Sequence, residues 1–184
     1  MKQVYIFVEG PADAEFLRRI LLPEVLKDAE IVTAGGSSGI PSLARSVLVR
    51  RKKPVAVVMD ADSIDPDVIA ERQESTEELI QAADASIPVK VVAAVPEIEA
   101  WLFAAPAVIA RALGESVPDE FIPLGRRDPS GVLQQLAAKN QRKWDSLRAI
   151  GLLDDDDIAR IRALPEVSEL SMFLNKLQRD GRAA

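Results

Sequence analysis

Residues 55–62 read VAVVMDAD, and this stretch decides the fold. Five apolar residues follow Pro54 without interruption, which predicts a buried strand over 55–59. Two aspartates, Asp60 and Asp62, come directly after that strand. In open parallel sheets, ligands bind beyond the carboxyl ends of the strands. An Asp-x-Asp pair in this place therefore indicates a functional loop more than an ordinary turn.

The segments on either side of this stretch alternate between strand and helix patterns. Short apolar runs predict the strands, and apolar residues at helical spacing predict the helices. Near-continuous apolar strands separated by helices indicate an α/β fold with a mainly parallel four-stranded sheet, Rossmann-like and covered by helices on both faces. The predicted strands are 4–8, 30–34, 55–59 and 89–95, and the predicted helices are 11–27, 41–51, 66–84 and one that opens at 96–102.

The pattern becomes helical after about residue 106. No repeat and no low-complexity linker separates this part from the rest. We therefore expect one domain with an α/β core over 1–105 and a helical extension over 106–184 packed on it. The predicted helices are 106–113, 129–138, 143–150, 154–163 and 166–179, with a short extended piece at 120–123.

Composition excludes several kinds of chemistry. The chain contains no cysteine and no histidine, so disulfides, thiolate zinc sites and histidine-based catalysis are impossible. A metal ion in this protein must bind oxygen ligands, which favours Mg²⁺, Mn²⁺ or Ca²⁺. No apolar run is long enough to span a membrane, and Met1-Lys2 leads straight into a predicted strand. We expect a cytoplasmic protein without a membrane partner.

Acidic residues follow three of the predicted strands, and these loops should meet at one edge of the sheet. At about 4 Å and an effective dielectric constant near 20, each pair of like charges repels by about 4 kcal/mol. Such crowding requires protons or cations, and a hard divalent ion is the natural partner. We predict a site for one or two Mg²⁺ or Mn²⁺ ions. Its candidate ligands are Glu9, Asp13, Asp60, Asp62, Glu97 and Glu99.

Simpler interpretations exist for some of these acids. Glu9 precedes Gly-Pro and fits a solvated turn, whereas Asp13, Glu97 and Glu99 lie near helix amino termini, where the helix dipole favours acids. On a regular helix Glu97 and Glu99 point about 200° apart, so both ligate one ion only if Glu97 precedes the helix. This favours Glu99. Asp65 is expected to cap the helix that follows it.

The net charge of −6 does not favour nucleic acid, but the basic residues are clustered. Clusters at 50–53, 126–127 and 139–143 are candidates to contact a phosphate backbone. The glycine-rich loop at 35–39 allows backbone to approach a phosphate, but it lacks the lysine of a P-loop. The predicted phosphate- or nucleic-acid-binding residues are Ser37, Ser38, Arg50, Arg51, Lys52, Arg126 and Arg127.

The segments Val8–Phe16, Met59–Asp62 and Glu97–Leu102 resemble a TOPRIM domain, and most closely the branch found in OLD (overcoming lysogenization defect) nucleases. The resemblance covers residues 3–105. It implies two-metal hydrolysis of DNA phosphodiesters, with Glu9 and Asp60 central to catalysis. It further implies metal ligation by Glu9, Asp13, Asp60, Asp62 and Glu99, and a transition-state lysine, Lys139 or Lys143. The chain differs from OLD proteins in having no ATPase domain and no Walker lysine motif.

Three functional hypotheses follow. The first is a Mg²⁺-dependent nuclease, with DNA favoured over RNA. The second is a non-catalytic metal-binding module that acts as a subunit or sensor with a separately encoded partner such as an ATPase. The third, a phosphoacceptor receiver or aspartyl phosphatase, fits less well, because such proteins need an aspartate after the first strand, where this chain has Glu9-Gly10.

Overall fold

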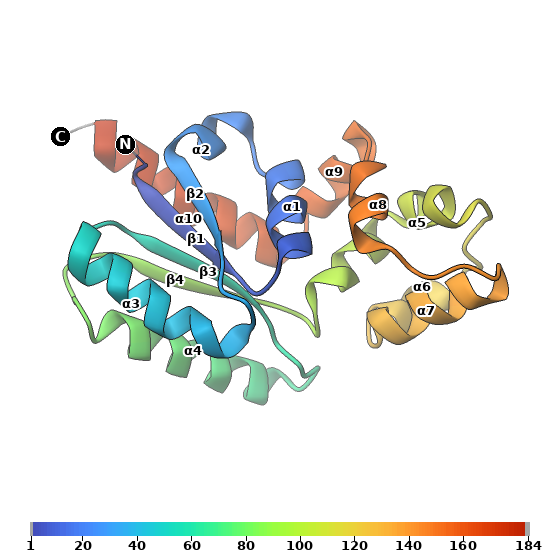
Figure 1. The fold of residues 1–184 in the computed structure, drawn as a ribbon, viewed down its shortest axis with the longest axis horizontal. Coiled ribbons are helices and arrows are strands. Elements are labelled where there is room, and N and C mark those ends of the chain that lie inside the picture. Colours follow the sequence, from blue (N-terminus) through green and yellow to red (C-terminus); the bar gives the residue numbers. More distant parts are fainter. Residues whose placement is uncertain (1, 183–184) are drawn as a thin grey trace.

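Four parallel strands form one sheet in the order β2-β1-β3-β4 (Figure 1). The computed structural model describes residues 2–182. β1 (Val4–Val8) pairs with both β2 (Ala29–Thr33) and β3 (Val55–Asp60), and β4 (Val89–Ala94) pairs with β3. All four carboxyl ends therefore lie at the same edge of the sheet. The predicted α/β fold with a parallel four-stranded sheet is confirmed.

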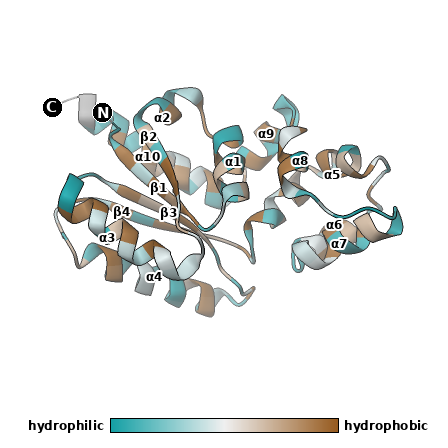
Figure 2. Cartoon of the chain, viewed as in Figure 1, coloured by the Kyte–Doolittle hydropathy of each residue, from teal (hydrophilic) through white to brown (hydrophobic). Residues whose placement is uncertain are grey.

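Both faces of the sheet are largely buried, because its strands are mostly apolar; β1 is apolar throughout, whereas β2 and β4 each carry a charged residue. In β1, Ile6 and Val8 belong to one hydrophobic cluster, while Tyr5 and Phe7 belong to the other. Alternate residues of a strand point to opposite faces, so a strand with two buried faces cannot alternate polar and apolar residues. Figure 2 shows the central strands coloured mainly as hydrophobic.

Helices cover each face of the sheet (Figure 1). α3 (Ile40–Arg51) and α4 (Pro66–Gln81) cover one face, where Leu48 and Ile80 are fully buried. α1 (Pro11–Ile20), α2 (Pro23–Asp28) and α10 (Pro165–Arg182) cover the other. The last helix of the chain thus returns to the sheet, where Leu170 and Leu174 join the same hydrophobic cluster as β1.

The remaining helices lie beyond the carboxyl ends of the strands (Figure 1). A short 3₁₀ helix, η1 (Ser37–Gly39), precedes α3, and a longer one, η2 (Ile98–Ala104), leads from β4 into this helical part. The division of the chain at residue 105 stays a prediction. The helices of this part are α5 (Pro106–Leu113), α6 (Phe121–Gly125), α7 (Pro129–Lys139), α8 (Ser146–Gly151) and α9 (Asp155–Arg162).

Some predicted boundaries are wrong. The helix expected over 11–27 is two helices, because Pro23 disfavours a helical conformation at the residue before it, and Leu22 is extended. Of the extended piece expected at 120–123, residues 121–123 are helical and belong to α6, and Glu120 directly precedes that helix. The helix expected to begin at 143 begins at Ser146, since the side chain of Asp145 caps it by accepting a hydrogen bond from the Arg148 backbone N–H. Asp65 caps α4, as predicted.

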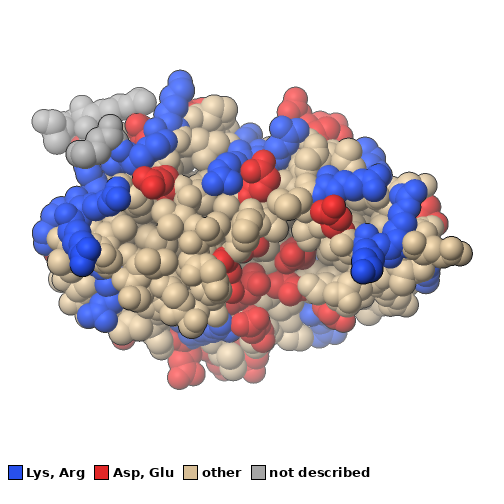
Figure 3. All heavy atoms as spheres, viewed as in Figure 1, with Lys and Arg blue, Asp and Glu red and all other residues tan. Residues whose placement is uncertain are grey.

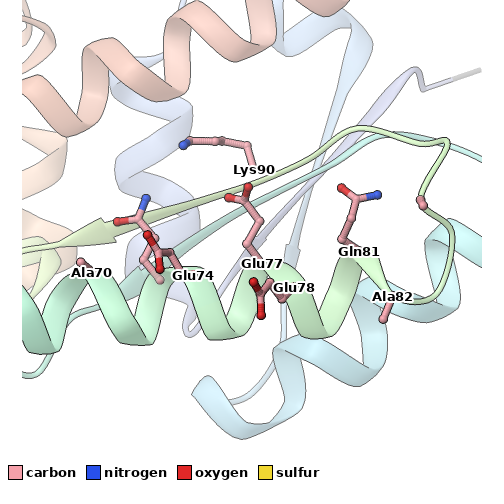
Figure 4. Close-up of a pocket in the computed structure, with 9 residues that line it drawn as sticks. Ala70, Glu74, Glu77, Glu78, Gln81, Ala82 and Lys90 are labelled. Atoms are coloured by element: carbon pink, nitrogen blue, oxygen red, sulfur yellow. The ribbon is translucent and has the colours of Figure 1, made fainter.

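The outer edge of β4 is hydrogen-bonded to side chains of α4. The backbone N–H of Val91 donates to Glu77 Oε2 at 2.9 Å, and the Val91 carbonyl accepts from Gln73 Nε2 at 2.7 Å. Figure 4 shows Glu77 pointing from α4 toward the strand that carries Lys90. Lys90 itself forms an ion pair with Glu169 of α10, so both helical layers are tied to this strand. No helix in the described residues is both long and apolar enough to cross a membrane.

We expect Gly125→Ala to destabilise the fold. A Cβ at this buried position in α6 would overlap the ring of Phe103, which is fully buried and cannot move aside. Overpacking of this kind costs about 1–3 kcal/mol. The matched control is Gly151→Ala in α8, where nothing lies within 4 Å of the added Cβ, so the free energy of unfolding should change by no more than about 1 kcal/mol. Urea unfolding of both variants measures the difference, and equal effects would contradict the packing described here.

Candidate carboxylate site

Three segments far apart in sequence are joined through carboxylates at the carboxyl edge of the sheet. Glu9, directly after β1, accepts a hydrogen bond at Oε1 from the backbone N–H of Asp60 at 3.2 Å. Asp60, the last residue of β3, accepts at Oδ1 from the backbone N–H of Ile98 at 2.9 Å. These bonds connect the ends of β1 and β3 to η2, and they place Glu9 beside Asp60.

The turn after β1 is also shaped by these residues. Asp13 Oδ2 accepts from the backbone N–H of Gly10 at 2.8 Å, which holds the first turn of α1 against the end of β1. The Glu9 carbonyl accepts from the N–H groups of Gly35 and Gly36 at 3.1 and 3.0 Å. Both glycines have positive φ, a conformation that other residues rarely adopt. The glycine-rich loop thus lies directly beside Glu9.

The electrostatics show that the acids are crowded. Burial raises the pKa of Asp60 from 3.8 to about 7; the nearby charges of Glu9, Glu99 and Asp13 add to the rise, and the hydrogen bond from Ile98 opposes it. Burial also raises the pKa of Glu99 and the pKa of Asp13. In Figure 3, acidic side chains gather near the middle of the face, where Figure 1 shows the strands ending. Glu9, Asp13, Asp60 and Glu99, called the carboxylate cluster below, therefore interact with one another.

Glu97 and Glu99 point to different neighbours. Glu97 precedes η2 in an extended conformation, and its Oε1 accepts from the backbone N–H of Ser130 at the start of α7 at 2.7 Å. Glu99 Oε1 accepts from the Ser146 hydroxyl at 3.4 Å. The charge of Glu97 still contributes to the raised pKa of Glu99. Both glutamates thus connect the sheet edge to the helical part of the chain.

Asp62 is placed differently from the rest. It adopts a left-handed conformation with φ of 51°, its side chain is mostly exposed, and its Oδ2 is 2.7 Å from Arg72 Nη1. Arg72 also donates to the Ala61 carbonyl at 2.9 Å. The second aspartate of the Asp-x-Asp motif therefore faces α4 in this structure. No sequence pattern pointed to Arg72 as its partner.

The predicted basic residues are distributed over both ends of the sheet. Lys52 pairs with Asp84 at 2.7 Å, and Arg51 contacts the Tyr5 ring and hydroxyl. These residues precede β3, so they lie at the opposite end from the carboxylate cluster. Arg126 and Arg127 are exposed just before α7, whose first turn contacts Glu97. The other predicted contacts lie on α3 and the loop before it: Ser37, Ser38 and Arg50 are exposed.

The donor set suits a hard divalent ion, but the carboxylates are not gathered around one point. Within residues 2–182, no group of three or more acidic side chains is arranged so that it could hold a metal ion. Glu9, Asp13, Asp60 and Glu97 each use one oxygen to accept a main-chain N–H. Because a carboxylate has two oxygens, each of these side chains could still offer its other oxygen to an ion.

The sequence matches no protein-family model and no curated protein. Solved structures do align with it. The C-terminal region of the Xanthomonas campestris pv. campestris OLD protein aligns over 99% of this chain and 98% of its own, with a TM-score of 0.51 and 16% identity. The chain shares the fold of this OLD region. The C-terminal region of the Burkholderia pseudomallei OLD protein aligns over 96% and 98%, with a TM-score of 0.51 and 15% identity.

The predicted resemblance to the OLD-type TOPRIM branch is thereby confirmed at the level of the fold. The structural likeness extends further than the sequence resemblance, which covered only residues 3–105. Because the alignment spans nearly the whole chain, it includes the helices that follow the sheet. The helical part is therefore a shared element of the OLD C-terminal fold.

We expect Asp60→Asn to stabilise the metal-free protein at high pH. The asparagine Oδ1 can still accept from Ile98, but it carries no charge. The pKa of Asp60 is higher in the folded protein than in the unfolded chain, so between about pH 4 and about pH 7 the folded protein holds a proton on Asp60 that the unfolded chain has lost. The free energy of unfolding of wild type therefore falls as pH rises from about 4 to about 7. Asp60→Asn does not have this pH dependence, so its melting temperature should exceed that of wild type by an amount that grows across this range. Each kcal/mol of difference in the free energy of unfolding corresponds to about 2–4 °C.

Thermal melts in EDTA between pH 4.5 and 8.5 measure this gain. The control is Asp119→Asn, which removes an exposed acid before α6 and should show no such pH dependence. A constant difference between wild type and Asp60→Asn at all pH values would show that burial and the neighbouring charges do not raise the pKa of Asp60.

Proposed function

We propose that this protein is a divalent-metal-dependent nuclease that hydrolyses phosphodiester bonds, with DNA favoured over RNA. One observation carries the proposal: Asp60 lies half-buried beside Glu9, and burial together with the charges of Glu9, Glu99 and Asp13 raises its pKa to about 7. Such crowding disfavours the metal-free ionised state, and a bound divalent cation would relieve it. The OLD-like fold supports the same conclusion.

Glu9, Asp13, Asp60 and Glu99 would hold the ion or ions, and Mg²⁺ or Mn²⁺ fits their oxygen donors. A bound ion of this kind supplies an activated water and stabilises charge on the scissile phosphate. Asp60 is central, because it is bonded to η2 and sits beside Glu9. Glu97 and Asp62 remain candidate ligands, although they contact Ser130 and Arg72 in this structure.

Of the two lysines considered for transition-state stabilisation, Lys143 is the better candidate. Lys139 lies over the Phe121 ring, with Nζ 4.4 Å from the ring centroid. Lys139 is the last residue of α7, and Ser130 in the first turn of that helix contacts Glu97. The separation of nine residues between Ser130 and Lys139 spans roughly 14 Å of helix, which places Lys139 far from Glu97. Lys143 lies three residues before Ser146, which contacts Glu99, so at most about 11 Å of chain separates them.

A non-catalytic metal-binding module is the second candidate function. The observation that favours it is the net charge of −6, because an acidic protein repels the phosphate backbone of a nucleic acid. In that case a separately encoded partner, such as an ATPase, would complete or use the site. Loss of Mg²⁺ binding in Asp60→Asn without loss of partner capture in a pull-down would support this function over the nuclease.

We expect wild type to cleave plasmid and single-stranded DNA with Mg²⁺ or Mn²⁺ and to be inactive in EDTA. Asp60→Asn should lower the rate by roughly a hundredfold or more, because even residues that only orient metal ligands contribute 10- to 100-fold. Asp119→Asn serves as the folded, charge-matched control and should cleave like wild type. Mg²⁺ should also raise the melting temperature of wild type at pH 8 more than that of Asp60→Asn. Equal background cleavage by wild type and Asp60→Asn would rule out the nuclease.

A further inference from the structure

A pocket in the helical part of the chain lies next to the carboxylate cluster, since Ser146 lines the pocket and contacts Glu99. It lies between the end of α5 and the start of α8 and has a volume of about 740 Å³, within the range of small-molecule sites. Its lining residues are Ala112, Leu113, Arg142, Lys143, Trp144, Asp145, Ser146, Leu147 and Arg148, and we call it the α5–α8 pocket.

Hydrogen bonds connect this pocket to the cluster. Trp144 Nε1 donates to the Ser146 hydroxyl at 3.0 Å, and that hydroxyl donates to Glu99 Oε1 at 3.4 Å. Ser146 also lines a small internal cavity that it shares with Asp13 and Glu99. One side chain therefore separates the α5–α8 pocket from two members of the carboxylate cluster. If one phosphate of a nucleic-acid strand lay at the carboxylate cluster, the neighbouring phosphates of that strand would lie in or near the α5–α8 pocket.

The charge of the pocket is opposite to that of the protein. Arg142, Lys143 and Arg148 line it with a single acid, Asp145, in a chain whose net charge is −6. Arg142 is held in place by a hydrogen bond from Nη1 to the Leu113 carbonyl at 2.7 Å. Within the part of the chain that the structure describes, neither Lys143 nor Arg148 forms an ion pair. Both side chains are exposed and available to an anionic ligand.

Trp144 adds an aromatic surface to these charges. It is half-buried against the hydrophobic core, and its bond to Ser146 fixes the orientation of the indole. Nucleic-acid bases stack on aromatic side chains regardless of sequence, provided the bases are unpaired. An aromatic ring beside free cations is the combination that binds single strands.

We propose that the α5–α8 pocket binds an unpaired stretch of the nucleic-acid substrate next to the scissile phosphate, with Lys143 and Arg148 on its phosphates and a base against Trp144. This inference rests on the proposed nuclease function and adds to it the strand form of the substrate. The substrate then needs a single-stranded segment beside the cut, such as an end, a gap or a flap.

Tryptophan fluorescence tests this binding directly. The sequence has two tryptophans, Trp101 and Trp144, so Trp101→Phe leaves Trp144 as the sole reporter. The substitution removes a buried indole N–H that has no hydrogen-bond partner among the described residues, so no hydrogen bond is lost. In this background, with Ca²⁺ present, the single strand (dT)₈ should quench Trp144 emission, whereas a blunt duplex of the same length should quench it weakly or not at all.

Removal of the two free cations should weaken binding in a defined way. In Lys143→Ala/Arg148→Ala the affinity for (dT)₈ should fall at least tenfold, and the plot of log K against log salt concentration should become shallower by about 1.4, or 0.7 for each lost phosphate contact on a single strand. The matched control is Lys176→Ala/Arg179→Ala on exposed positions of α10, toward the opposite end of the sheet. It removes the same charge and should bind within twofold of the parent.

Three results would overturn the inference: quenching by duplex and single strand alike, unchanged salt dependence in Lys143→Ala/Arg148→Ala, or equal weakening by the control pair. Cleavage of plasmid by wild type, measured in parallel, separates the two proposals. If wild type cleaves but the pocket variants bind (dT)₈ normally, the pocket proposal fails and the nuclease stands. If (dT)₈ binds as expected and nothing is cleaved, the nuclease fails and the binding site stands.

Discussion

The structure depends on one constraint: Asp60 lies half-buried at the carboxyl edge of the sheet, with other acids close to it. The strand before Asp60 is fully apolar and central, which carries the aspartate into the protein. Its carboxylate and that of Glu9 then join β1, β3 and η2 through backbone hydrogen bonds. The carboxylates of Glu9 and Asp60 thus hold this edge of the sheet together, and they also repel each other when both are charged. The fold keeps them close and does not remove that repulsion. A bound cation would offset the repulsion between these carboxylates, whose backbone hydrogen bonds already hold the strands and η2 in place.

The helical part of the chain supplies hydrogen-bond donors to the acids that follow β4. Glu97 receives the N–H of Ser130 from α7, and Glu99 receives the hydroxyl of Ser146 from α8. Two adjacent acids of the sheet edge are therefore each oriented by a different helix of the second half. The likeness to the OLD C-terminal region spans both halves of the chain, although the recognisable motifs lie only in the first.

The sheet was predictable because its strands are mostly apolar and acidic residues directly follow three of them. The convergence of Glu9, Asp60 and Glu99 followed from topology, since parallel strands bring their carboxyl ends together. Contacts between distant residues were not predictable: nothing in the sequence links Ser146 to Glu99, or Arg72 to Asp62. Helix boundaries failed where a local effect overrode periodicity, as Pro23 does after α1.

The bonds that Gln73 and Glu77 make to Val91 have a consequence for self-association. β4 is an edge strand, and an edge with free main-chain groups invites a strand from another molecule to extend the sheet. At Val91 both groups are already occupied by side chains of the protein's own helix. A strand added at the centre of this edge would have to displace both bonds, which disfavours growth of the sheet along β4.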